Sequence, residues 1–95
     1  MTIAEIRTKD KIDVCIHGHS GYAKPGSDII CAGISSLAQA FSLVAENATI
    51  DTDDGFLRVA ADLSENNKIR LSMFEAGLKA IADEYPQYLE IFSQK

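Results

Sequence analysis

The chain has 95 residues, of which 46% are hydrophobic and 24% charged, and its formal net charge is −5 at pH 7. These values predict a single globular domain over residues 1–95, and they exclude a disordered chain and a second independent core. The nine Lys and Arg residues are scattered along the chain, so direct nucleic-acid binding is disfavoured, whereas a basic protein or peptide would suit the acidic surface.

The first two predicted elements are strands. Residues 2–8 carry Ile3 and Ile6, and a polar turn follows at residues 9–10. Residues 11–17 alternate between apolar and other side chains, which is typical of a half-buried strand. The set expected on the core is Ile12, Val14 and Ile16, and the set expected on the opposite face is Asp13, Cys15 and His17.

The next segment is a loop followed by a helix. The loop contains the chain-breaking residues Gly18, Gly21, Pro25 and Gly26. Ser27 or Asp28 is the expected N-cap of a helix over residues 29–46. The apolar residues of that segment fall at spacings of three and four, which predicts one buried stripe. The stripe consists of Ile30, Ile34, Leu37, Phe41 and Val44.

The second half of the chain repeats the pattern of two strands and a helix. Asp54-Gly55 predicts a tight turn between strands at residues 49–53 and 56–62. A second helix is expected over residues 66–84, with Leu71, Phe74, Leu78, Ile81 and Tyr85 as its apolar stripe and Pro86 at its end. Residues 87–95 read as a short helical turn or a fraying tail.

The order of these elements predicts an α+β fold. We expect a two-layer β-β-α-β-β-α sandwich in which two helices cover one face of a four-stranded, mainly antiparallel sheet. No stretch is apolar enough for a signal peptide or a membrane span, so we expect a cytoplasmic protein without membrane contact. Cys15 and Cys31 are then expected to be free thiols.

Cys31 and His19 are the candidates for chemistry. Cys31 falls in the first turn of the predicted helix, where the helix dipole and unpaired N–H groups favour a thiolate. His19 follows the second strand, and the loop is long enough to bring its imidazole back to the helix start. Cysteine catalysis needs this pairing of a nucleophile with a base. Each residue alone would more often be structural: a small buried thiol and a solvated histidine.

Two further residues fall near the predicted nucleophile. Asp28 precedes Cys31 by three residues and either orients His19 or caps the helix. Ser35 follows Cys31 by four residues and hydrogen-bonds near the thiolate or back to a helix carbonyl. The N–H groups of the helix start are candidates for an oxyanion hole. Cys15 is interpreted as structural and His17 as a polar strand residue.

The residues fit two other kinds of site less well. Cys15, His17, His19 and Cys31 have the chemistry of zinc ligands but lack the paired spacing of structural zinc sites. The glycine-rich loop lacks the Gly-Lys-Ser/Thr ending of a nucleotide-binding loop, since Lys24 precedes Pro25. We therefore expect no metal and no cofactor.

The segment from Gly18 to Leu37 resembles the ribosomal-processing cysteine protease family, Prp. The resemblance rests on Gly-His-Ser-Gly-Tyr-Ala at residues 18–23 and Gly-Ser-Asp-Ile-Ile-Cys-Ala-Gly at residues 26–33. Eleven residues separate His19 from Cys31, and Ser35 follows. It implies a homodimeric β-β-α-β-β-α endopeptidase that removes a short N-terminal extension from bacterial large ribosomal subunit protein twenty-seven.

The same resemblance implies roles for individual residues. Cys31 would be the nucleophile, His19 the base, and Asp28 and Ser35 supporting groups. The loop over residues 20–27 would admit the peptide. Pro25 departs from the family's pattern, which has more variable and often charged residues there, and would stiffen the loop. The residues assigned to this substrate loop are Gly18, Ser20, Gly21, Tyr22 and Gly26. The alternative function is a non-catalytic, ribosome-associated adaptor that binds a basic partner.

Overall fold

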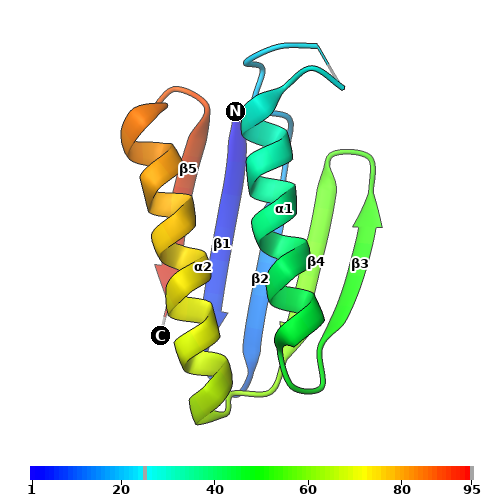
Figure 1. The fold of residues 1–95 in the computed structure, drawn as a ribbon, viewed down its shortest axis with the longest axis vertical. Helices are drawn as coiled ribbons and strands as arrows, with labels where there is room; N and C mark the ends of the chain where they lie inside the picture. Colours follow the sequence, from blue (N-terminus) through cyan, green and yellow to red (C-terminus); the bar gives the residue numbers. More distant parts are fainter. Residues whose placement is uncertain (25, 95) are drawn as a thin grey trace.

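The computed structural model describes residues 1–24 and 26–94, which form two layers (Figure 1). The elements in chain order are β1 (Thr2–Thr8), β2 (Ile12–His17), α1 (Ile29–Val44), β3 (Thr49–Asp53), β4 (Phe56–Ala61), α2 (Glu65–Glu84) and β5 (Leu89–Gln94). Both helices lie on one face of the sheet, with α2 over the β5 side and α1 nearer the β3 side (Figure 1). No helix within the described ranges is long and apolar enough to cross a membrane.

The described part of the chain forms a five-stranded mixed sheet, so the prediction of four strands was wrong. The strand order is β3-β4-β2-β1-β5. The pairs β1–β2, β2–β4 and β3–β4 are antiparallel, whereas β5 runs parallel to β1. The helical turn or tail expected after Pro86 is a strand instead, because β1 would otherwise leave a row of backbone groups without partners. Lys95 lies outside the described residues.

The core lies between the sheet and the helices. Ile12, Val14 and Ile16 are buried, which confirms the predicted face of β2. The apolar stripe of α1 is confirmed at Ile30, Ile34 and Phe41, and Leu37 packs partly buried against the core. Val44 is 57% exposed because α1 ends there, two residues before the predicted end, and the fully buried Ala38 takes part in the core instead. In α2, the buried members of the predicted stripe are Leu71, Phe74 and Leu78.

Asn67 joins the connection between α1 and β3 to the connection between β4 and α2. Its side chain is fully buried, and its Nδ2 donates to the carbonyl oxygens of Glu46 (3.1 Å) and Asp62 (2.8 Å). Its Oδ1 accepts from the Glu46 N–H at 2.8 Å. Ser64 caps α2 by accepting from the Asn67 N–H. One amide therefore fixes where α1 ends, where β3 starts and where α2 begins.

Candidate active site

Cys31 lies in the first turn of α1, as predicted, because Asp28 is the N-cap. The Asp28 Oδ1 accepts hydrogen bonds from the N–H groups of Ile30 and Cys31, both at 3.0 Å. The Ala32 N–H donates to the Asp28 carbonyl oxygen at 3.0 Å. These three helix-start amides are therefore occupied, and the expectation that such amides form an oxyanion hole is not supported at these positions.

The Asp28 carboxylate also organises the loop before the helix. Ser20, which is buried, donates its hydroxyl to Oδ2, and the Ala23 N–H contacts the same oxygen at 3.4 Å. Burial alone would raise the pKa of the Asp28 carboxyl, but hydrogen bonds from Ser20, Cys31, Ala23 and Ile30 outweigh it and lower that pKa to about 2. Of the two roles predicted for Asp28, the structure places it in helix capping, with loop anchoring in addition.

The loop is further anchored by aromatic packing. The Tyr22 ring packs edge to face against Tyr85 and Tyr88, with ring centroids 5.6 Å and 5.3 Å apart. Gly18 approaches the N-terminus so closely that a Cβ there would lie 2.6 Å from the Met1 carbonyl oxygen. Gly21 and Gly26 adopt positive φ angles at open positions of the loop. Pro25, for which we expected a stiffening effect, lies outside the described residues.

His19 lies just beyond β2, against the turn between β3 and β4. Its Nε2 is 3.5 Å from Oδ1 of Asp54. The Gly18 N–H donates to the Gly55 carbonyl oxygen at 2.8 Å, which ties the end of β2 to that turn. Gly55 has φ +66°, and a Cβ there would lie 3.0 Å from His19 Nε2, so a glycine allows the ring to lie against the turn. The carboxylate beside His19 is therefore Asp54, which the sequence indicated only as a turn residue.

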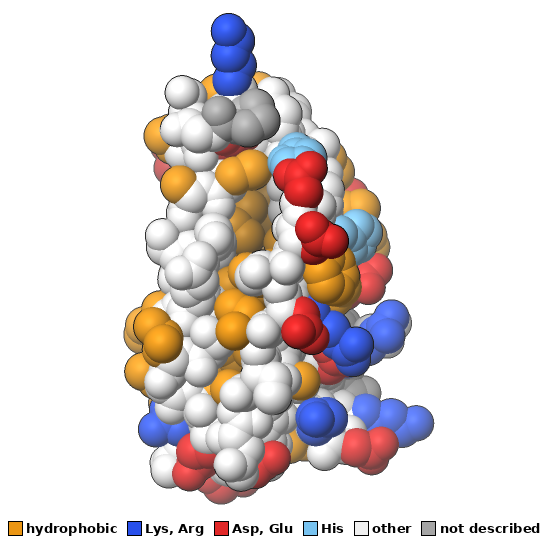
Figure 2. Space-filling model, turned by 90° about the vertical axis from the view of Figure 1, so that its right-hand side faces the viewer, with side chains coloured by type: hydrophobic (Ala, Val, Ile, Leu, Met, Phe, Trp, Pro, Cys, Tyr) orange, Lys and Arg blue, Asp and Glu red, His pale blue; other side chains and the backbone are white. Residues whose placement is uncertain are grey.

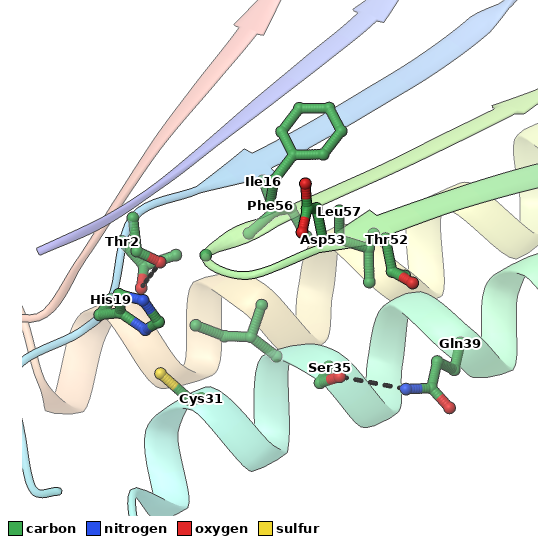
Figure 3. Close-up of a pocket in the computed structure, with 13 residues that line it drawn as sticks. Thr2, Ile16, His19, Cys31, Ser35, Gln39, Thr52, Asp53, Phe56 and Leu57 are labelled. Atoms are coloured by element: carbon green, nitrogen blue, oxygen red, sulfur yellow. Dashed lines mark hydrogen bonds between the residues drawn. The ribbon is translucent and has the colours of Figure 1, made fainter. Parts of the chain in front are cut away.

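His19, Cys31 and Ser35 line two adjoining hollows. The first, of about 320 Å³, lies between α1 and the β3–β4 hairpin. The second, of about 620 Å³, lies on the loop side, next to Gly21, Ala23 and Gly26. Figure 3 shows the Cys31 thiol directed toward the His19 ring at one end of the first hollow. A chain that passes through both hollows would cross the Cys31–His19 pair.

The first hollow forms a groove with an apolar floor and polar rims. Ile16, Ile34 and Leu57 belong to its floor, since each is buried in the core. Its other lining residues are Thr2, Gly18, Gln39, Thr52, Asp53, Gly55 and Phe56. Ser35 accepts a hydrogen bond from Gln39 Nε2 at 3.1 Å, and no bond joins Ser35 to Cys31 within the described chain. Of the two contacts expected for Ser35, with the thiol or with a helix carbonyl, neither is present in the described residues, and its partner is the Gln39 side chain one turn further along α1.

Cys15 and His17 lie on the other face of the sheet. His17 Nε2 is 3.9 Å from Glu5 Oε1, and Cys15 pairs in register with Glu5 and Arg58. Burial raises the pKa of the Cys15 thiol, and the neighbouring Glu5 raises it further. The four residues weighed as zinc ligands therefore fall on two faces of the sheet, and the described residues contain no cluster of three or more potential ligands.

The family model described as cysteine protease Prp matches residues 1–90. The chain belongs to the Prp family. No curated protein sequence gives a significant match.

Solved structures share the fold of this chain, among them two that are described as Prp. A Staphylococcus aureus structure described as an essential ribosomal processing protease Prp with a covalently linked product peptide is 24% identical, with a TM-score of 0.86. The S. aureus Prp with a substrate peptide is 25% identical, with a TM-score of 0.76. Each of these alignments covers 99% of this chain and 100% of the other. SMU.848 from Streptococcus mutans is 24% identical over 99% of this chain and 96% of that chain, with a TM-score of 0.70.

Proposed function

We propose that this protein is a cysteine endopeptidase that removes the N-terminal extension of bacterial large ribosomal subunit protein twenty-seven. The observation that carries the proposal is that Cys31 and His19, from a helix start and a strand end, line the same groove in a chain of the Prp family. The S. aureus relatives are described as ribosomal processing proteases and were solved with substrate and product peptides. Those descriptions support a ribosomal protein as the substrate.

The reaction would proceed in two steps. The Cys31 thiolate attacks the carbonyl carbon of the scissile peptide bond, and protonated His19 gives its proton to the leaving amine as the C–N bond breaks. The acyl chain then remains on Cys31 as a thioester. In the second step His19 removes a proton from water as the water oxygen attacks the thioester carbon. The C–S bond then breaks, the carboxylic acid product leaves and loses its proton to solvent, and the pair of Cys31 thiolate and protonated His19 is restored.

Asp54 and Asp28 would support this pair in different ways. The Asp54 carboxylate lies 3.5 Å from His19 Nε2 and would pair with that nitrogen when the ring is protonated, which would leave Nδ1 to face the thiol. Asp28 holds Cys31 in place by capping α1 and holds the loop through Ser20. Ser35, on the helix rim of the groove, is within the surface that a bound peptide would contact.

Two proposed partners, a basic ribosomal substrate and a second copy of this chain, are supported by the acidic charge and by exposed apolar residues. A net charge of −5 favours a basic ribosomal protein by electrostatic steering. Leu43, Ile69 and Met73 are 85%, 69% and 73% exposed, and burial of such apolar side chains at a subunit interface would support the homodimer implied by the family. A ribosomal substrate also fits the cytoplasmic location expected from the sequence.

Cleavage of the extended ribosomal protein tests the proposal. We expect Cys31→Ala and His19→Ala to lose cleavage by at least about a thousandfold, as removal of a nucleophile or base does in other enzymes of this type. Cys15→Ala and His17→Ala are matched controls, since they remove the same side chains from the opposite face of the sheet. Undiminished cleavage by Cys31→Ala or His19→Ala would exclude the assignment.

Thiol alkylation separates the protease from the adaptor. In the protease, Cys31 reacts with iodoacetamide faster than an ordinary thiol, and His19→Ala slows the reaction. In a non-catalytic adaptor, Cys31 reacts no faster than a cysteine in an unfolded peptide, and His19→Ala has no effect.

A further inference from the structure

The open edge of the sheet at β3 has no assigned role in the proposed reaction. β3 is the outermost strand beside β4, and all 5 of its residues are exposed. Figure 2 faces this edge and shows apolar side chains in the hollow between α1 and the hairpin, with acidic side chains along the hairpin. An edge strand of this kind is a template for pairing with another extended chain.

The register fixes which backbone groups of β3 are free. The Gly18 N–H donates to the Gly55 carbonyl. Hydrogen-bonded and non-hydrogen-bonded pairs alternate along an antiparallel ladder, so the next pair, His17 and Phe56, has no mutual hydrogen bonds. Phe56 therefore directs its N–H and C=O toward β3. Asp53 and Asp51 therefore face β4 across Phe56 and Arg58. The alternation of an antiparallel ladder leaves the N–H and C=O groups of Ile50 and Thr52 directed away from β4.

The side chains of β3 differ between its two faces. Ile50 and Thr52 pair with Val59 and Leu57 and so lie on the helix side, where Thr52 lines the groove. Asp51 and Asp53 lie on the other side with Arg58 and Phe56. Arg58 is held by Asp13 through two hydrogen bonds of 2.9 Å and 2.7 Å. Neither Asp51 nor Asp53 forms an ion pair with any described residue.

We propose that β3 binds an extended, basic segment of the substrate by strand addition. The main chain of that segment pairs with Ile50 and Thr52, and its Lys or Arg side chains meet Asp51 and Asp53. Alternate side chains enter the groove between β3 and α1. This inference rests on the proposed proteolytic function and adds the recognition of the substrate to it.

The position of β3 leads such a segment to the reacting groups. β3 ends at Asp53, and the next residue is Asp54, whose carboxylate contacts His19. Thr52 lines the same groove as Cys31 and His19 (Figure 3). A strand that follows β3 toward its C-terminal end therefore arrives at the pair that would cut it.

Charge favours the basic segment over a second copy of this chain. If two β3 strands paired with each other, the carboxylates of Asp51 and Asp53 would lie close to those of the partner strand, and like charges across a strand pair are destabilising. β3 also carries no Lys or Arg that could relieve the repulsion.

Amide hydrogen exchange provides the first test. The probe is a synthetic peptide that covers the N-terminal extension of ribosomal protein twenty-seven and the residues after it, added in excess to the full-length Cys31→Ala protein. We expect the Ile50 and Thr52 amides to exchange about tenfold more slowly with peptide than without. The Asp51 amide, which faces β4, is the internal control and is expected to change much less.

Substitutions on β3 provide the second test, read as the Kd of the same peptide. Thr52→Pro removes the free N–H at a position where an edge strand tolerates proline, and we expect binding about 3- to 10-fold weaker than that of Thr52→Ala. The Asp51→Asn/Asp53→Asn double variant is expected to bind about tenfold more weakly than Asp83→Asn/Glu84→Gln, which makes the same change of charge on α2. Thermal unfolding confirms that each variant is folded.

Three results would overturn the inference. The first is unchanged exchange of Ile50 and Thr52 at saturating peptide. The second is equal binding by Thr52→Pro and Thr52→Ala. The third is protection that grows with protein concentration in the absence of peptide, which would assign the edge to a second copy of this chain. Cleavage of the same peptide by the wild-type protein decides the proposed function separately, because binding to the Cys31→Ala protein does not depend on cleavage.

Discussion

At the scale of single residues, Asp54 connects the hairpin turn to His19. Its Oδ1 lies 3.5 Å from His19 Nε2, although its side chain is 93% exposed. A contact so open to solvent contributes little to folding, so its effect should be on the orientation of the ring. We expect Asp54→Ala to lower kcat about tenfold with little change in KM, since a misplaced base slows the chemical step more than binding.

The matched variants identify how Asp54 acts. Asp54→Asn keeps an acceptor oxygen at the same place and is expected to recover most of kcat, whereas Asp83→Ala removes a carboxylate from α2 and should leave kcat unchanged. Steady-state kinetics on one peptide substrate gives kcat and KM for the wild type and for these three variants. A loss in KM alone, or equal losses for the Asn and Ala variants, would contradict a positioning role.

Asp28 makes a pH-dependent contribution to stability. Its carboxyl has a pKa of about 2 in the folded chain, against about 3.9 in an unfolded one. The folded state therefore binds fewer protons, so the contribution, of at most about 2.6 kcal/mol, is present above pH about 4 and is lost as the pH falls toward 2. We expect urea unfolding between these pH values to show a weaker pH dependence for Asp28→Asn than for wild type, and an intermediate one for Ser20→Ala. Equal slopes for all three would rule out this contribution.

At the scale of elements, alternation and helical spacing predicted most of the fold, and they failed where the structure depends on long-range pairing. The buried face of β2, the cap and first turn of α1 and the β3–β4 turn were all readable from local patterns. β5 was not, because it becomes a strand by pairing with β1, more than eighty residues earlier in the chain.

The candidate site likewise has residues that a local pattern predicts and a contact that only the fold creates. The motif indicated His19 and Cys31, whereas the contact of Asp54 with His19 depends on the pairing of β4 with β2.

Asn67 is where the elements are joined, and its removal should be costly. Asn67→Ala removes the buried side chain that accepts from the Glu46 N–H and donates to the carbonyls of Glu46 and Asp62, and only the Glu46 carbonyl keeps another partner, the Asp62 N–H at 3.3 Å. We expect a loss of about 3 kcal/mol in the free energy of unfolding, or roughly 15 °C in Tm. The neighbouring Asn66 is exposed, so Asn66→Ala should change stability by no more than about 0.5 kcal/mol. Similar Tm values for the two variants would show that Asn67 does not join these elements.

At the scale of the whole molecule, the acidic charge and the two hollows act together. Nine basic residues oppose fourteen acidic ones, and Asp51, Asp53 and Asp54 gather on the hairpin beside the groove. The negative field of these residues attracts a basic chain, and salt shortens the range of that attraction. The Debye length falls from about 10 Å at 0.1 M to about 3 Å at 1 M. The charge of the molecule should therefore act mainly on substrate capture and much less on the bond that is cut.

This separation can be measured as a dependence on ionic strength. Between about 0.05 M and 0.5 M NaCl we expect kcat/KM for a Lys-rich peptide to fall by about tenfold, while kcat at saturating peptide changes less than twofold. A peptide of the same length with Gln in place of each Lys serves as the neutral control and should show little change in kcat/KM. Alkylation of Cys31 by uncharged iodoacetamide, which needs no steering, should also be nearly constant. An equal fall for both peptides would mean that salt acts on the enzyme itself, and the acidic hairpin would then have no part in selecting a basic substrate.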